Sequence, residues 1–492
     1  MHDALRPITG KPAQKDASAW SARLTRLDMR GVLLGCLLLV CTPSFALDPY
    51  RVEGYLLPNG LQIILKPGDE RAHVAIRLVV GVGFDDFPCA EQELPHLLEH
   101  LLFSGVDDSG EGGLEERMQA LGGEWNAYTS SADTTFVIEA PARNQRKVLD
   151  LLLTILTQTR INEQTLALSK RIVEREDGGH YSHLQRLLDR QDLGRTPSSQ
   201  LAVELGLKCP ERSQVQDMTL EQVERVRTHW YAPNNMSLIV VGGLDKLLPA
   251  YLERAWGSLE PVEPSDHQDL LTLSRQAAPE RNLMRGWLGD GAKLHWYFLE
   301  PVLETSHPQT LDLLQNCLDW MLYSELRLKH GLSYGPWSKR ESFGDSGLMS
   351  LNADLDRKDI TQARQVLAQL IARLQKEGLD PATFARLKQL AITRQSWSPQ
   401  GNSALADYYW SALPDYADGR FARPAQQLRE VSLDEVNQAM RQLLAKPGYV
   451  RIEMPLLGYD QLYRIVAGVV AVGILAILGA LIWRKRKRSN AR

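Results

Sequence analysis

The chain has 492 residues, which is more than one hydrophobic core ordinarily organises and about enough for two large domains with additional segments. Hydrophobic residues make up 44% of the chain and charged residues 24%, an ordinary globular balance. The formal net charge is −4 and no long basic run lies within the body of the chain, which argues against a nucleic-acid-binding protein.

An apolar run near the N-terminus predicts export. Gly31–Val40 follows a basic residue and is too short to span a bilayer comfortably, which favours a secretory signal over an anchor. Thr42–Ala46 supplies the small residues that signal peptidase requires, with cleavage expected after Ala46. We therefore predict a signal peptide region over residues 1–46.

The segment Pro95–Phe103 predicts a metal-binding helix. On a helix His96 and His100 lie on one face, about 5–6 Å apart, so two imidazoles can reach one ion. A catalytic zinc site needs three protein ligands and a water. Glu99 borders the same face and can reach that water rather than the metal. This H-x-x-E-H order reverses the zincin pattern, although five residues on a buried helix also match by chance.

A third ligand must come from elsewhere in the chain. The predicted helix Arg171–Asp177 offers Glu174 and Glu176. Their spacing does not choose between them, and a solvated, charged helix face is the commoner fate of such a run. The sequence pattern leaves both glutamates open.

An internal repeat in the sequence pattern indicates two related units. Met218–Val223 and Val431–Val436 both read as a capped helix start, with Thr219 or Ser432 as the N-cap, 213 residues apart. Each helix leads into an extended run. The runs are Ser237–Val241 and Val450–Met454.

Helical and extended patterns both occur along the body, with several β runs of meander type, which predicts an α+β fold of two tandem homologous domains. We place the N-terminal domain at residues 47–260 and the C-terminal domain at residues 281–458. Residues 261–280 form the linker between them, because Pro261–Gln268 is polar and contains proline. Further strands are expected at Gly60–Leu65, Ala75–Gly81 and Leu294–Leu299.

The C-terminal segment predicts a membrane anchor. Ile465–Trp483 carries no charge and is long enough to cross roughly 30 Å of hydrocarbon. The basic tail at residues 484–492 follows at once and is expected to stay in the cytoplasm. With the N-terminal signal, this predicts a single-pass protein of the bacterial inner membrane whose body lies on the periplasmic side.

The five cysteines do not predict a disulfide framework. Two of them belong to or adjoin the N-terminal apolar run, which leaves Cys89, Cys209 and Cys317, widely spaced and odd in number. We therefore expect these three to be small buried or half-buried residues, in a compartment that is permitted, but not required, to be oxidising.

Together these motifs resemble the pitrilysin/insulinase family of inverted zincins, which includes the mitochondrial processing peptidases. Leu94–Gly105 resembles the family's metal helix and the loop after it. Gly122–Pro141 resembles its edge strand beside the zinc, and Tyr231–Gly242 the closing strand of its first domain. The resemblance spans roughly residues 47 to 455. The edge strand's family core, which contacts substrate, falls on Asn126, Ala127 and Thr129.

The resemblance implies the remaining site residues. In the family the third zinc ligand is a glutamate about 76 residues beyond the second histidine, which favours Glu176 over Glu174. The family also uses an Arg and a Tyr seven residues apart to bind the substrate backbone and the oxyanion, which fall on Arg327 and Tyr334. One zinc ion per chain is implied.

Two departures from the family pattern stand out. Many members carry a second glutamate seven residues before the ligand, and this position is Ser169 here. Such outer partners orient ligands, so its loss is expected to weaken the site unless another acid such as Glu174 replaces it. The C-terminal anchor is also not general in the family.

The function expected from the resemblance is that of a zinc metalloendopeptidase acting on peptides or unfolded polypeptides. Family members form two-chain chambers, so a homodimer is expected, with a heterodimer of related chains as its rival. The alternative is a non-catalytic, membrane-tethered scaffold or assembly subunit that keeps the peptidase fold.

Overall fold

The computed structural model describes residues 48–489, except 108, 177–195, 210–214, 264–276, 304–306, 345 and 396–399. The predicted signal peptide region at 1–46 and most of the predicted linker therefore lie outside the described residues. All of the sheets and helices belong to the unit Pro49–Arg492.

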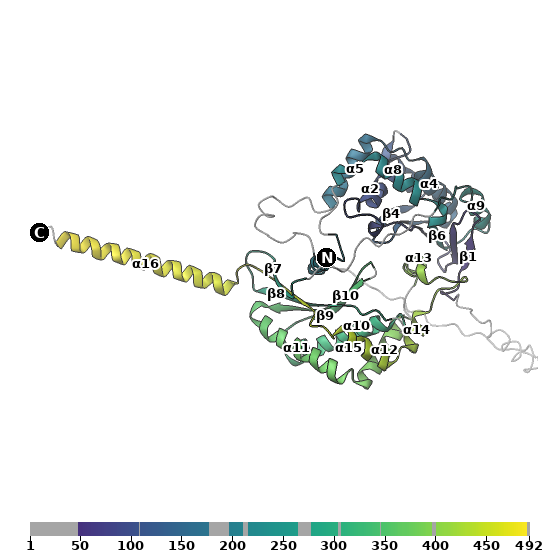
Figure 1. The fold of residues 1–492 in the computed structure, drawn as a ribbon. Coiled ribbons are helices and arrows are strands. Elements are labelled where there is room, and N and C mark those ends of the chain that lie inside the picture. Colours follow the sequence, from purple (N-terminus) through teal and green to yellow (C-terminus); the bar gives the residue numbers. More distant parts are fainter. Residues whose placement is uncertain are drawn as a thin grey trace, which may run out of the picture. The chain divides into compact units, whose positions relative to one another are not determined.

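The first sheet has six strands in the order β1-β2-β6-β3-β5-β4. Figure 1 labels β1, β6 and β4 of this sheet. β2 and β6 are parallel, and every other neighbouring pair is antiparallel. The strands are β1 (Glu53–Leu56), β2 (Gln62–Pro67), β3 (His73–Val80), β4 (Glu124–Thr129), β5 (Thr134–Pro141) and β6 (Met236–Gly242).

The second sheet has the order β7-β11-β8-β10-β9. Here β7 and β11 are parallel and the other pairs antiparallel. Its strands are β7 (Glu280–Met284), β8 (Gly291–Leu299), β9 (Trp337–Phe343), β10 (Ser346–Asp356) and β11 (Tyr449–Met454). Taken in chain order, β2 to β6 and β7 to β11 occupy the same places in their sheets, so both halves follow one topology.

Helices accompany each sheet. Those of the first half are α2 (Leu94–Leu102), α3 (Gly110–Ala120), α4 (Gln145–Gln158), α5 (Glu163–Glu176), α7 (Pro197–Leu205), α8 (Leu220–Trp230) and α9 (Leu248–Ala255). Those of the second are α10 (Thr310–Leu322), α11 (Ile360–Glu377), α12 (Pro381–Gln395), α13 (Asn402–Ser411), α14 (Pro424–Glu430), α15 (Leu433–Leu443) and α16 (Tyr459–Ser489). The α+β class expected from the sequence agrees with these two sheets and their helices.

The predicted helix starts are confirmed in both halves. Thr219 caps α8 and Ser432 caps α15, and each forms a reciprocal capping box with the residue three positions later. Each helix leads into a strand of a parallel pair, β6 beside β2 or β11 beside β7. The repeat in the sequence pattern therefore marks equivalent positions in the two topologies.

β3 is buried on both faces, which explains its nearly continuous apolar sequence. Side chains alternate across a strand, so the set that begins at Val74 packs into the main core with α2 and α4. The set that begins at Ala75 packs into a separate cluster with residues of α13. The helices of the first half thus cover one face of this sheet, and a helix of the second half covers part of the other.

Each half contributes one helix to the sheet of the other half, and we call these the crossing helices. α13 contributes Ala406 and Tyr409 to the cluster on the first sheet. α7, from the first half, contributes Leu201 and Leu205 to a cluster with Tyr297 of the second sheet. Each half therefore completes the packing of the other.

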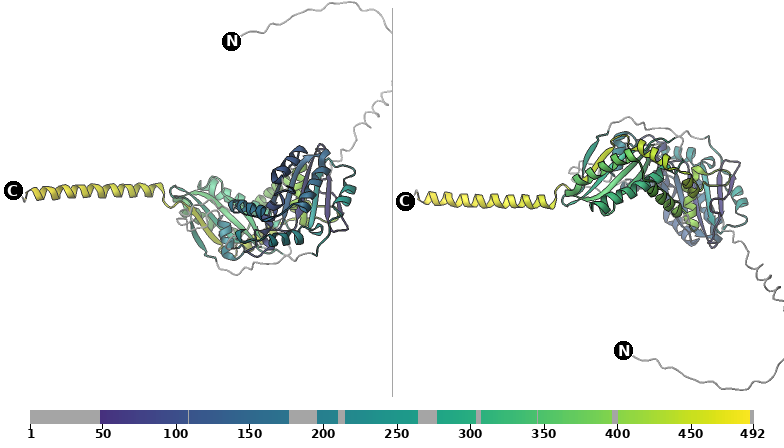
Figure 2. Two further views of the ribbon diagram at one scale, coloured as in Figure 1. Left: turned by 90° about the horizontal axis from the view of Figure 1, so that it is seen from above. Right: turned by 90° about the horizontal axis from the view of Figure 1, so that it is seen from below.

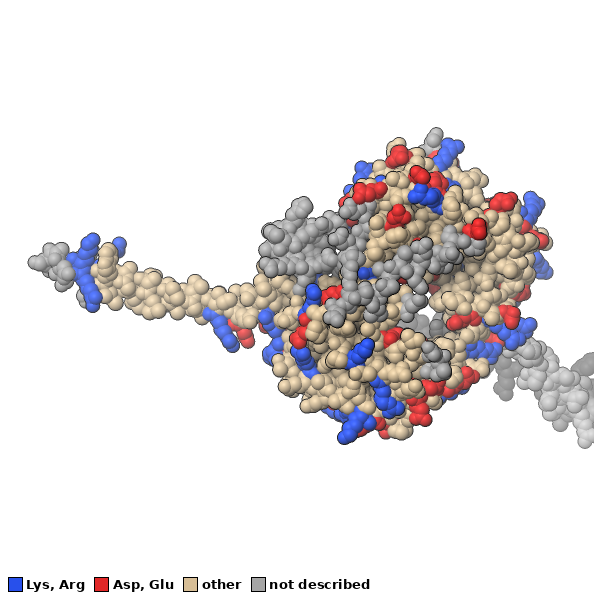
Figure 3. All heavy atoms as spheres, viewed as in Figure 1, with Lys and Arg blue, Asp and Glu red and all other residues tan. Residues whose placement is uncertain are grey.

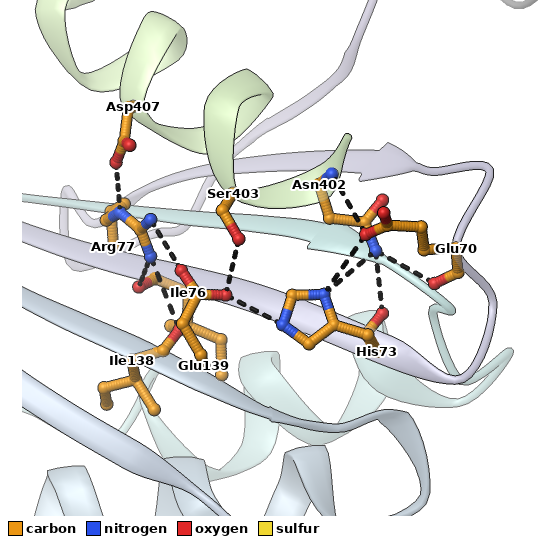
Figure 4. Close-up of polar contacts among 9 residues, drawn as sticks. All are labelled: Glu70, His73, Ile76, Arg77, Ile138, Glu139, Asn402, Ser403 and Asp407. Carbon is orange, nitrogen blue, oxygen red and sulfur yellow. Dashed lines mark hydrogen bonds and ion pairs between the residues drawn. The ribbon is translucent and has the colours of Figure 1, made fainter. Parts of the chain in front are cut away.

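A buried arginine fixes α13 to the first sheet (Figure 4). Arg77 on β3 is 1% exposed, and its guanidinium donates to Asp407 of α13 at 2.8 Å and to Glu139 of β5 at 2.8 Å. Glu139 also accepts from Ser403 at 2.9 Å and pairs with His73 at 2.8 Å. The guanidinium is buried while both carboxylates reach solvent, so these contacts keep the buried charge paired.

The second sheet has a matching arrangement. Arg451 of β11 is buried and donates to Glu204 of α7 at 2.7 Å. Arg281 pairs with the other oxygen of Glu204 at 3.1 Å. Both crossing helices are thus held to the sheet of the opposite half by an arginine–carboxylate contact.

α16 is a single continuous helix that includes the predicted span Ile465–Trp483 (Figure 2). Among the described residues, it is the one helix long and apolar enough to cross a membrane, over Tyr459–Arg484, and none of that window is buried. Its length and composition agree with the sequence-based prediction of a span.

Candidate metal centre

The helix α2 presents its polar residues on one side. Pro95 lies in the first turn, where its missing N–H removes no helical hydrogen bond. The leucines around it are fully buried in the main core, which fixes the rotation of the helix. His96 and His100 are consequently only half-buried, and they face the same way from neighbouring turns.

His96, His100 and Glu176 meet at one point. The two Nε2 atoms are 3.2 Å apart, and Oε2 of Glu176 lies 3.2 Å from the first and 3.3 Å from the second. A tetrahedral ion with ligand bonds of about 2.0–2.1 Å separates its ligand atoms by about 3.3–3.4 Å. The three atoms therefore have the mutual spacing that a zinc ion requires.

Glu93 hydrogen-bonds to Nδ1 of His96, the ring nitrogen outside the ligand cluster. Oε2 of Glu93 lies 3.0 Å from Nδ1 of His96, three residues later. Because an ionised carboxylate only accepts, Nδ1 carries the proton and Nε2 of the neutral ring presents a lone pair. This is the tautomer that binds a metal through Nε2.

The electrostatic field at the site favours positive charge. Burial lowers the pKa of the His96 imidazole, but the hydrogen bond with Glu93 and the negative charges of Glu93, Glu99 and Glu176 outweigh it and raise the pKa. A group of acceptor atoms in such a field binds a proton or a cation. The donor set of two imidazoles and one carboxylate fits zinc.

Glu99 is held apart from the ligand cluster. Its side chain is buried, and Oε2 accepts a hydrogen bond of 2.7 Å from Thr129 Oγ1 on β4. Thr129 thereby links the metal helix to the edge strand. The arrangement leaves Glu99 next to the cluster without making it a fourth ligand.

The structure separates the two candidate glutamates on α5. Glu176, its last residue, joins the histidines, whereas Glu174 accepts from Gln216 at 3.0 Å. Ser169, in place of the family's second glutamate, is buried on the same helix. Glu93, which the sequence reading missed, supplies an outer carboxylate from another direction.

The strand β4 is the last strand of its sheet, so its outer edge is not paired within that sheet. Ala127 of β4 is buried against the core, while Asn126 is exposed and its side chain donates to Tyr128 at 3.1 Å. The family core residues Asn126, Ala127 and Thr129 thus lie on an edge strand that contacts Glu99.

Arg327 and Tyr334 contact each other. The Arg327 guanidinium donates to the backbone oxygen of Tyr334 at 2.7 Å and lies 4.3 Å from the centre of its ring. Tyr334 is mostly exposed. Within the described residues, neither side chain hydrogen-bonds to the metal cluster.

The expectation that no disulfide forms is wrong. Cys89 and Cys209 are bonded, with a sequence separation of 120 residues, while Cys317 is free and buried. The bond joins the loop before α2 to the segment after α7. Two distant cysteines in sequence gave no spacing signal, and only the fold brings them together.

Two models of one peptidase family match the chain. The model described as insulinase, peptidase family M16, matches residues 63–193, and that described as the M16 inactive domain matches residues 217–390. The first match contains the metal cluster and the second contains Arg327 and Tyr334.

Relatives and solved structures agree with this assignment. YmxG of Bacillus subtilis, named an uncharacterized zinc protease, is 20% identical over 423 residues, which cover 80% of this chain and 96% of YmxG. Mb2805c of Mycobacterium bovis, also named an uncharacterized zinc protease, is 23% identical over 428 residues, which cover 82% of this chain and 92% of Mb2805c.

Among solved structures, a protease of Helicobacter pylori has a TM-score of 0.64 at 17% identity, covering 82% of this chain and 100% of its own. The periplasmic protease PqqL of Escherichia coli has a TM-score of 0.66 at 16% identity, covering 82% and 47%. The ferredoxin protease FusC, solved with Arabidopsis ferredoxin, has a TM-score of 0.62 at 16% identity, covering 82% and 48%. These structures share the fold. The two family models, over residues 63–193 and 217–390, show that the chain belongs to peptidase family M16, the pitrilysin/insulinase family.

Proposed function

We propose that the chain is a membrane-anchored zinc metalloendopeptidase that hydrolyses peptides or unfolded polypeptide segments. The observation that carries the proposal is the 3.2–3.3 Å triangle of His96, His100 and Glu176 ligand atoms. Relatives are named zinc proteases, which supports zinc as the metal and peptide hydrolysis as the reaction.

The chemistry divides between the metal and the chain. A zinc ion held by His96, His100 and Glu176 would supply a Lewis acid that activates water and polarises the scissile carbonyl. Glu99 takes the proton of the attacking water and passes one to the leaving amine. Thr129 donates to Oε2 of Glu99, which leaves Oε1 to handle the proton.

The substrate is proposed to bind as an added strand along β4. Backbone pairing with Asn126, Ala127 and Thr129 holds an extended chain without reading its side chains, which suits a broad set of unfolded segments. The structure of FusC, solved in complex with a ferredoxin, supports a polypeptide substrate.

Arg327 and Tyr334 are proposed to bind the substrate backbone and the developing oxyanion. Preorganised donors of this kind contribute about 2.7–4 kcal/mol each to the transition state. Their contact with each other in the second half keeps both groups together. Because the chain carries both parts of this machinery, a homodimer in which one chain serves the site of the other is preferred over a heterodimer.

The chain is proposed to lie in a bacterial inner membrane, with α16 as a single span and the folded body on the periplasmic side. The uncharged stretch followed by a basic tail supports this orientation. The periplasmic relative PqqL is consistent with it.

The test is metal analysis and peptide cleavage with the purified full-length chain in detergent. The proposal expects about one zinc per chain and hydrolysis of unstructured peptides that stops on chelation and returns with zinc. A chain that neither holds zinc nor cleaves such peptides would instead be the non-catalytic scaffold with a peptidase fold.

A further inference from the structure

We propose that the loop Arg285–Asp290, between β7 and β8, is a second membrane contact, with Trp287 and Leu288 in the headgroup layer of the bilayer that α16 crosses. The inference rests on the proposed membrane anchor. It adds a contact made by the folded body itself.

Exposed tryptophans mark both ends of the apolar helix. Within the described part of the chain, Trp287 is 54% exposed and Trp483 is 63% exposed, and no other tryptophan there is classed as exposed. Trp483 ends the apolar stretch beside the basic tail. Figure 3 shows α16 without charge along its middle, with basic side chains at its far end and both basic and acidic ones where it meets the body. Spanning helices carry such aromatic residues at both membrane–water interfaces, which assigns Trp287 to the opposite one.

Backbone hydrogen bonds tie the loop to the start of α16. The N–H of Leu457 donates to Trp287 O at 3.0 Å, and the N–H of Leu456 donates to Gly286 O at 3.1 Å. The N–H of Tyr459, the first residue of α16, donates to Asp290 Oδ1 at 3.0 Å. The loop and the helix start are therefore one local structure.

The length of helix between the loop and the uncharged stretch places the loop at the outer boundary of the headgroup layer. Ile465, where the uncharged stretch begins, is six positions after Tyr459. This spacing is a rise of about 9 Å along the helix axis. The headgroup region adds roughly 5–8 Å to each side of the hydrocarbon. The backbone of a loop bonded to the first turn of α16 therefore lies at the outer boundary of that layer, and the exposed side chains of Trp287 and Leu288 can reach into it from there.

Further apolar and aromatic side chains are exposed beside the loop. Leu456, Tyr459 and Tyr463 are also exposed beside the loop. Two basic side chains there pair with carboxylates: Arg285 with Glu453 at 2.6 Å and Lys358 with Asp356 at 3.5 Å. An apolar and aromatic contact, rather than attraction to anionic lipid, is what this surface offers.

The test uses the full-length chain in phosphatidylcholine nanodiscs with a fluorophore on a cysteine introduced by Leu288→Cys. Lipids with a quencher near the headgroup should quench this probe several-fold more than a probe at Val302→Cys. Val302 is 83% exposed and follows the far end of β8, about 30 Å from the loop along the strand. Adding Trp287→Ser should weaken the quenching of the Leu288→Cys probe.

The outcomes separate the two proposals. If the chain is extracted from membranes by alkaline carbonate, the anchor itself fails. If the chain stays anchored but the Leu288→Cys probe is quenched no more than the Val302→Cys probe, the anchor stands and the loop contact is overturned. Quenching that persists in high salt supports the apolar contact, and quenching lost in high salt contradicts it.

Discussion

Nδ1 of His96 lies 3.0 Å from Oε2 of Glu93, one turn earlier at the start of the metal helix. This contact fixes the ring and leaves Nε2 directed toward His100 and Glu176. It also offers an outer-shell carboxylate in a chain that has Ser169 where many relatives have a glutamate.

Glu93→Gln should weaken zinc binding about 10- to 100-fold, because outer-shell partners of metal-bound histidines contribute on that scale. The measurement is competition with a zinc chelator. Glu91→Gln is the matched control, since Glu91 accepts from Gln222 at 2.9 Å in the same loop. Equal zinc affinity in the two variants would remove Glu93 from the site.

Glu176→Gln should lose more zinc affinity than the Glu93 variant, because it removes an inner ligand. Glu174→Gln should retain zinc, since its carboxylate pairs with Gln216 and not with the histidines. Zinc content after dialysis distinguishes the two variants. Loss of zinc from Glu174→Gln and not from Glu176→Gln would assign the third ligand to Glu174.

Reduction of the Cys89–Cys209 bond should destabilise the folded body by about 2–5 kcal/mol, because the bond closes a long loop in the unfolded chain. Thermal unfolding with and without reductant measures this. The double variant Cys89→Ser, Cys209→Ser should be destabilised already and should no longer respond to reductant. A wild-type chain indifferent to reductant would argue that the two thiols are unpaired.

Glu453 should stabilise the second half in a pH-dependent way. Burial raises the pKa of its carboxyl, but hydrogen bonds with His295 and Arg285 outweigh burial and hold the pKa at about 2. Because the folded-state pKa lies below that of the unfolded chain, this stability is fully present above about pH 4.5 and is lost as the pH falls toward 2.

The test compares wild type with Glu453→Gln by urea unfolding at pH 7 and pH 3. The variant should be less stable by about 1–3 kcal/mol at pH 7, with a smaller difference at pH 3. Asp354→Asn, at an exposed pair with Lys293, should change little at either pH. A Glu453 difference that grows on acidification would contradict the assignment.

Local patterns predicted much of the fold. The caps at Thr219 and Ser432 and the edge position of β4 agree with the structure, because each depends on neighbouring residues or on the likeness to the family. The i, i+4 spacing of His96 and His100 likewise places both imidazoles together. The contact between Glu93 and His96 could also have been predicted, since Glu93 lies three residues before His96 and an i, i+3 carboxylate reaches the ring.

The long-range features could not be predicted in this way. The crossing of α7 and α13 between halves depends on contacts such as Arg77–Asp407, 330 residues apart, and no local pattern encodes them. An arginine in the middle of the apolar β3 was the available sign that a carboxylate must face it. The Cys89–Cys209 bond depends on the same crossing, because Cys209 follows α7.

The most direct test of the account compares zinc content and peptide cleavage in wild type and Glu99→Gln. Because Glu99 bonds Thr129 and is not one of the three ligands, the variant should keep about one zinc per chain and lose cleavage by about 10²- to 10⁴-fold. Wild-type protein without zinc, or equal cleavage by the two chains, would contradict it.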